Sequence, residues 1–154
     1  MKKLLIILTV MVGLLRADED TVKLLLDLTT SDIGKFERTM LKGVALNKAY
    51  YQSKFKDLEV VAMIHGDAYK FFVKDLSTSP YKDDTKLLKV SKDFAVRIKS
   101  LHDTYKVKFL ICEAGMKHRS IKKDNIFDFV EVIPNAMIGL IDAQNDGAAY
   151  VPVK

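Results

Sequence analysis

Short apolar runs of the length of a β-strand alternate with segments of helical periodicity along most of this chain. The apolar runs occupy residues 22–28, 58–64, 107–113, 129–133 and 148–153. Helical spacing of apolar side chains marks the intervening residues 33–54, 84–103 and 135–146. This alternation predicts one α/β domain, in which helices cover both faces of a parallel, or mostly parallel, sheet.

Each of the longer predicted helices has an apolar face that indicates its buried side. In residues 84–103 this face is formed by Leu87, Phe94, Ile98 and Leu101. The last helix begins after Asn135 as its N-cap and ends near Gly147. We expect its buried side to consist of Met137, Ile138, Leu140 and Ile141.

The first 17 residues have the pattern of a secretory signal peptide. Lys2 and Lys3 precede a largely apolar run over residues 4–15, which is too short to cross a bilayer as a helix. We therefore expect cleavage after Ala17, a domain over residues 18–154 and a periplasmic location, with no membrane span after cleavage. A first buried strand is the alternative interpretation of the same run.

The charge of the chain argues against nucleic acid as a partner. The whole sequence carries a net charge of +5, and residues 1–17 contribute Lys2, Lys3 and Arg16 without any acidic residue. The remaining domain therefore has a net charge of +5 − 3 = +2. Its lysines alternate with Asp and Glu and form no basic cluster with interleaved aromatic residues, so we expect no nucleic-acid binding.

A single cysteine, Cys112, ends the apolar run VKFLICE. One cysteine cannot form an internal disulfide. In an oxidising compartment it is buried and inert, paired between chains, bound to a metal, or used as a reactive thiol. Nearby cations and a helix N-terminus stabilise a thiolate, and Gly115, Lys117, His118 and Arg119 follow within about one turn. Together with Gly66, we expect these residues to form the supporting loop of the site. A small buried core residue is the alternative interpretation.

His65 is the second candidate for a functional side chain. It ends the run at residues 58–64 together with Gly66, so His65 and Cys112 should lie at the carboxyl edge of the sheet, where ligands of such folds gather. A histidine there can hold a thiolate or pass a proton, whereas the alternative is a ring that only satisfies the turn. Asp27 lies near the end of the first run, and we expect it to cap a helix or to face solvent rather than to act as a general acid.

A metal centre is a further possibility. His65, Cys112, Met116 and His118 include the ligand types of an electron-transfer copper site. Copper sites of that type usually rest on all-β sandwiches, whereas this chain alternates strands and helices. We therefore expect neither a metal nor another cofactor.

Three segments, IHGDAYKFFVKD, VKFLICEAGM and VEVIPNAMIGLIDAQNDGAAYVPV, resemble the DsrE/DsrF-like proteins of bacterial sulfur metabolism. The matching positions are His65, Gly66, Cys112, Pro134, Gln144, Gly147 and Tyr150. The resemblance implies a three-layer α/β/α domain around a five-stranded parallel sheet, assembled as a trimer or hexamer. It also implies that Cys112 carries sulfur as a persulfide and exchanges it with a donor or acceptor protein. Many members continue with Cys-x-Asn-Thr-Leu, whereas this chain reads Cys-Glu-Ala-Gly-Met.

Two functional hypotheses follow. In the first, the protein is a periplasmic sulfur-handling protein that binds or relays sulfane sulfur on Cys112, with His65 and the basic loop holding the thiolate. In the second, it is a non-catalytic oligomeric module that binds a small ligand, a metal or a protein partner, and Cys112 is a core residue. In either case we expect a homo-oligomer, with Tyr50, Tyr51, Phe71 and Phe72 available to pack between subunits.

Overall fold

The computed structural model describes residues 20–154, so the predicted signal peptide and its cleavage point after Ala17 lie outside the described residues. Five strands form one parallel sheet in the order β4-β3-β2-β1-β5. The strands are β1 (Thr21–Leu28), β2 (Asp57–Ile64), β3 (Lys108–Cys112), β4 (Glu131–Ile133) and β5 (Ala149–Val153). The prediction of an α/β domain with a five-stranded parallel sheet is confirmed.

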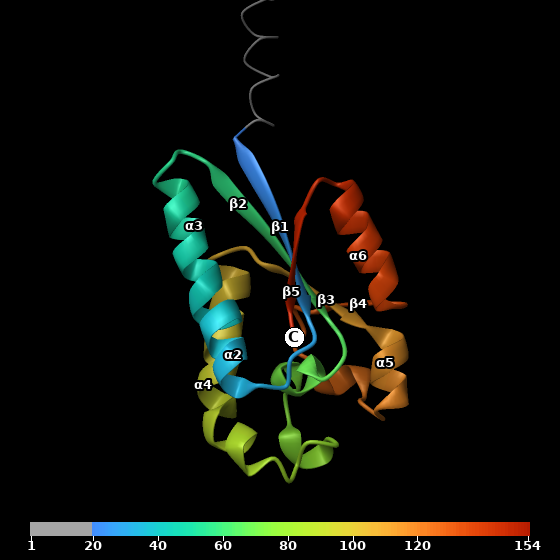
Figure 1. Ribbon diagram of the computed structural model, residues 1–154. Helices are drawn as coiled ribbons and strands as arrows, with labels where there is room; N and C mark the ends of the chain where they lie inside the picture. Colours follow the sequence, from blue (N-terminus) through green and yellow to red (C-terminus); the bar gives the residue numbers. More distant parts are fainter. Residues whose placement is uncertain (1–19) are drawn as a thin grey trace, which may run out of the picture.

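Helices lie on both faces of this sheet (Figure 1). One layer contains α2 (Ile33–Phe36), α3 (Val44–Gln52) and α4 (Thr85–Asp103), and the other contains α5 (Glu113–His118) and α6 (Ala136–Asn145). Short 3₁₀ segments η2 (Ala68–Phe72), η3 (Leu76–Thr78) and η4 (Lys123–Asn125) connect them. Within residues 20–154, no helix combines the length and the apolar character needed to cross a membrane.

The helical segment predicted for residues 33–54 is present, with an interruption in its middle. Between α2 and α3 the backbone forms a π-helix, η1 (Glu37–Gly43). This segment buries the consecutive residues Met40 and Leu41 next to Phe36 and Val44. This spacing of buried residues is also ordinary for an α-helix, and π segments are rare, so periodicity alone does not predict one.

Helix α4 matches its prediction closely. Its buried residues are Leu87, Phe94, Ile98 and Leu101, and the Asp84 carboxylate caps its first turn by accepting the Leu87 N–H at 2.9 Å. The ring of Phe94 packs near Phe36 and Phe71 in an aromatic cluster, in which the Phe36 and Phe71 centroids are 4.0 Å apart.

This aromatic cluster corrects one expectation about assembly. Phe71 and Phe72 are both buried in the core of the chain, so they are not available to pack between subunits. Tyr50 does lie on the surface, with 58% of its area exposed, and Tyr51 is half-buried. The short 3₁₀ segment η2, which packs against α4, turns both phenylalanines inward.

Helix α6 packs on the sheet through its small residues, which corrects the predicted orientation. Gly139 is the buried residue of this helix, and a Cβ added there would lie 2.7 Å from Met63 Sδ. Met137, Ile138 and Ile141, expected in the core, are 69%, 40% and 49% exposed. Because α6 is apolar on most sides, hydrophobicity does not identify the side that faces the sheet. That side is identified by Gly139, since only glycine permits so close an approach to the sheet.

Candidate functional site at the carboxyl edge of the sheet

A buried carboxylate, Asp27, lies near the end of β1 at the carboxyl edge of the sheet. The residue is 6% exposed. Its Oδ1 lies 2.5 Å from Nε2 of His65, and its Oδ2 accepts a hydrogen bond from the Tyr150 hydroxyl. The expectation that Asp27 caps a helix or faces solvent is therefore wrong. Since β1 lies between β2 and β5, side chains from both neighbouring strands enclose its end.

The turn after β2 fixes the position of His65. Its backbone N–H donates to the Leu28 carbonyl at 3.1 Å, which continues the ladder between β1 and β2 by one residue. Gly66 has a φ of +60°, and a Cβ there would lie 3.0 Å from the Thr29 Cβ. The left-handed conformation and the close contact both favour glycine, so Gly66 allows the chain to turn while His65 stays beside Asp27.

Tyr150 reaches the same carboxylate from the edge strand β5. The register places Pro152 opposite Asp27, and Tyr150, two residues earlier, points to the same face. The hydrogen bond to Asp27 raises the pKa of the Tyr150 phenol above its ordinary value. Tyr150 therefore remains a protonated hydrogen-bond donor at neutral pH, although 43% of its surface is exposed.

Cys112 ends β3, the strand next to β2. The last paired residues of these strands are Ile64 and Ile111, so His65 and Cys112 both come one position later. Leu110 and Asp27 each pair with Met63, which places Cys112 and Asp27 on the same face of the sheet. Thus β1, β2 and β3 deliver a carboxylate, an imidazole and a thiol to one edge and one face.

Cys112 is 7% exposed, and its thiol lies at the start of α5. The Gly115 N–H donates a hydrogen bond to its Sγ at 3.4 Å, as expected when a helix begins directly after the cysteine. Sγ thus accepts a hydrogen bond from a backbone N–H, and such donors stabilise the negative charge of a thiolate.

Tyr69, which the sequence did not indicate, holds the junction between β3 and α5. Its hydroxyl donates to the Cys112 carbonyl at 3.0 Å. A Cβ at Gly115 would lie 1.9 Å from this hydroxyl, so the approach of the tyrosine requires glycine at that position. Burial first, and Cys112 second, raise the pKa of Tyr69 well above its ordinary value, which keeps the hydroxyl protonated.

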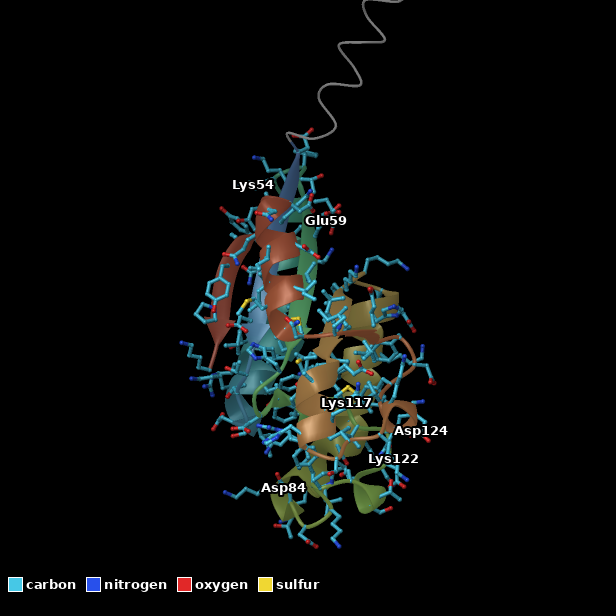
Figure 2. All side chains as sticks on the ribbon, turned by 90° about the vertical axis from the view of Figure 1, so that its right-hand side faces the viewer. Lys54, Glu59, Asp84, Lys117, Lys122 and Asp124 are labelled. Atoms are coloured by element: carbon cyan, nitrogen blue, oxygen red, sulfur yellow. The ribbon has the colours of Figure 1, made fainter. Side chains whose placement is uncertain are left out.

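The basic side chains of the supporting loop do not form ion pairs or hydrogen bonds with the sulfur. Lys117 pairs with Glu113 at 3.2 Å and is largely exposed on the outer surface of α5 (Figure 2). Arg119 pairs with Asp67 at 2.7 Å and lies over the ring of Tyr69. His118 is also exposed. The expectation that these cations hold the thiolate is therefore not supported, because Lys117 and Arg119 are each paired with a carboxylate.

The four side chains considered for a copper centre do not form one ligand set. Met116 is 2% exposed and belongs to the core, whereas His118 is exposed at the far end of the same helix. Among residues 20–154, no group of three or more His, Cys, Asp and Glu side chains is placed to hold a metal ion.

A pocket beside α6 lies away from this edge. It has a volume of about 570 Å³ and opens at the amino-terminal half of the sheet, near Glu59, Lys108 and Glu131. Glu59 is labelled in Figure 2. Its polar groups are a mixture of acidic and basic side chains, and it includes none of Asp27, His65 and Cys112. The chemistry of the carboxyl edge, rather than the size of this pocket, identifies the candidate site.

Comparison with known proteins agrees with this architecture. A solved structure of MTH1491, a protein of unknown function from Methanobacterium thermoautotrophicum, matches with a TM-score of 0.59 over 85% of this chain and 98% of that chain, at 14% identity. An uncharacterized protein of Aquifex aeolicus (strain VF5) is 33% identical over 97 residues, which cover 63% of this chain and 41% of that relative. The model of the DsrE/DsrF-like family matches residues 18–153. With its parallel five-stranded sheet and this match over nearly the whole domain, the chain belongs to the DsrE/DsrF-like family.

Proposed function

We propose that this protein binds or relays sulfane sulfur on Cys112 in the periplasm. Membership of the DsrE/DsrF-like family supports a protein of the sulfur-relay type. The observation that carries the assignment to Cys112 is its place at the carboxyl edge, where the Gly115 N–H reaches Sγ and His65 follows the neighbouring strand. It is also the one thiol in the sequence.

The proposed step moves a neutral sulfur atom between two thiolates. His65 accepts the thiol proton, and the Cys112 thiolate attacks the terminal sulfur of a polysulfide or persulfide donor. A bond forms between Sγ and that sulfur, the donor's S–S bond breaks, and the remaining donor sulfur leaves as a thiolate. Attack by an acceptor thiolate on the outer sulfur of the Cys112 persulfide reverses the process, without any added oxidant or reductant.

Cyanide tests this proposal, because it removes sulfane sulfur from persulfides as thiocyanate. Protein incubated with polysulfide and freed of excess reagent should release thiocyanate in proportion to the number of chains. The Cys112→Ser variant retains a side chain of similar size and should release none. Equal release from both proteins would mean that the sulfur is adsorbed elsewhere, and the proposal would fail.

A binding module without sulfur chemistry is the second candidate, favoured by the low exposure of the thiol. Cys112 is 7% exposed, which is ordinary for a cysteine that only fills the core. In that case the exposed apolar side of α6 would be the functional surface. Iodoacetamide distinguishes the two, because a core thiol reacts only when the domain unfolds, whereas a sulfur-accepting thiol reacts in the folded protein.

A further inference from the structure

Asp27, His65 and Tyr150 form one hydrogen-bonded cluster, of which the proposed sulfur step uses only His65. We propose that Asp27 is a positioning residue, which holds the His65 ring by its protonated Nε2 and leaves Nδ1 as the basic nitrogen of the site. Tyr150 in turn holds Asp27. This inference rests on the proposed function in one respect, namely that the base serves the thiol of Cys112.

The protonation pattern that we assign to the cluster follows from hydrogen-bond chemistry with an ionised Asp27 and a neutral His65. An ionised carboxylate only accepts hydrogen bonds, so the nitrogen that lies 2.5 Å from Asp27 Oδ1 must carry a proton. A neutral imidazole has one protonated nitrogen and one acceptor nitrogen. With the proton on Nε2, the lone pair of His65 is on Nδ1.

The two sides of the Asp27 carboxylate are occupied by different donors. His65 reaches Oδ1, and the Tyr150 hydroxyl reaches Oδ2. Both bonds span large sequence separations and come from opposite neighbouring strands, β2 and β5. Because the carboxylate is 6% exposed and hydrogen-bonded through both oxygens, it has little freedom to rotate away from the imidazole.

The opposite side of the imidazole is available for chemistry. Nδ1 forms no hydrogen bond within residues 20–154, and the His65 side chain keeps 27% of its surface exposed. The backbone of His65 is fixed by its bond to the Leu28 carbonyl. The ring is therefore anchored through one nitrogen and the backbone, and the second nitrogen is free to accept a proton from a group at the carboxyl edge.

Nuclear magnetic resonance of the intact domain tests the anchoring directly. We expect the Nε2 proton of His65 to resonate far downfield and to exchange slowly, because it donates to a buried carboxylate. Asp27→Leu removes the acceptor and should abolish this signal, whereas Asp93→Asn, on the exposed side of α4, should leave it unchanged. If Asp27→Leu does not fold, Asp27→Asn keeps the shape with a weaker, neutral acceptor, and the signal should move upfield.

The reaction of Cys112 with iodoacetamide tests whether Asp27 acts through His65. We expect Asp27→Leu to slow this reaction about tenfold. Loss of the carboxylate that orients a metal-binding histidine lowers metal affinity or activity by about 10- to 100-fold, and we take the lower end of that range. In a His65→Ala background the same substitution should have no further effect, because a positioning residue has nothing left to position. Equal slowing in both backgrounds, or a wild-type protein without the downfield proton, would overturn the inference. A downfield proton in a protein that takes up no sulfur would reject the proposed function alone.

Discussion

At the scale of single residues, the site depends on one close contact between Gly115 and Tyr69. Gly115→Ala places a methyl group 1.9 Å from the Tyr69 hydroxyl, so the tyrosine must leave its bond to the Cys112 carbonyl. We expect the free energy of unfolding to fall by about 1–3 kcal/mol, the usual cost of overpacking a core. Urea denaturation followed by circular dichroism measures this change.

Gly34→Ala is the matched control for this substitution. The added methyl group would meet its nearest atoms at 3.4 Å, an ordinary contact, in the first turn of α2. We expect the free energy of unfolding to stay the same or to rise by up to about 1 kcal/mol, because alanine favours the helix. An equal loss of stability in both variants would show that the contact with Tyr69 is not the cause.

The residues that the sequence did not reveal are those whose partners lie far along the chain. His65 and Cys112 were predictable, because each ends an apolar run of strand length. Asp27 also ends such a run, but its partners are 38 and 123 residues away, and no local pattern connects them. Tyr69 has the same difficulty, since its hydroxyl meets a carbonyl 43 residues later.

At the scale of elements, the cap of α4 gives a prediction that depends on pH. The Leu87 N–H first, and Lys70 second, lower the pKa of Asp84 below its ordinary value of 3.8. A lowered pKa in the folded state stabilises the fold above pH 3.8 and loses that effect as the pH falls through the folded value. Asp84→Ala should therefore lower the free energy of unfolding by about 1 kcal/mol at pH 7.

Urea denaturation at pH 7 and at decreasing pH below 3.8 checks this expectation. The difference between wild type and Asp84→Ala should shrink as the carboxylate becomes protonated. Asp128→Ala removes an exposed ion pair with Lys74 and caps no helix, so we expect little change at either pH. A difference for Asp84→Ala that does not depend on pH would contradict the role of its charge.

The helices also show which elements a sequence can orient. The buried side of α4 was predictable, because mostly polar residues cover its other side and Leu87, Phe94, Ile98 and Leu101 form one apolar face. The orientation of α6 was not predictable from hydrophobicity, because apolar side chains surround most of it. Gly139 was the available signal, since a glycine within a helix often marks close packing against a sheet.

At the scale of the whole molecule, α6 and the strand β5 that follows it carry several exposed apolar side chains. We call this surface the α6–β5 face and define it by Met137, Ile138, Ile141 and Tyr150, which are all exposed. Exposed apolar patches of this kind usually mark interaction sites, and β5 is an edge strand. We expect a homo-oligomer, a trimer or hexamer, in which this face is covered.

Light scattering of the purified domain tests the assembly. Ile141→Lys should reduce the measured mass towards that of one chain, because a buried lysine disfavours the interface. Val96→Lys is the control, since Val96 is 70% exposed on α4, in the opposite layer. A wild-type mass equal to one chain would contradict the prediction of an oligomer.

The location of the protein is a separate prediction that rests on residues 1–17. We expect a periplasmic extract to contain a chain that begins at Asp18, because Ala17 precedes the predicted cleavage point. Mass spectrometry of the protein from each cell fraction identifies its first residue. A full-length chain in the cytoplasm would contradict the prediction of export. Cys112 would then lie in a reducing compartment, where an unpaired thiol is ordinary.

The central claim, that Cys112 accepts sulfane sulfur, is tested most directly by the intact mass of the protein after incubation with polysulfide. The account predicts a gain of one or more sulfur masses on each chain, removed by a thiol reductant and absent in Cys112→Ser. Peptide mapping should place the added sulfur on the segment FLICEAGMK, which contains the one cysteine. An unchanged mass in the folded wild-type protein, under conditions in which a free thiol compound gains sulfur, would contradict it.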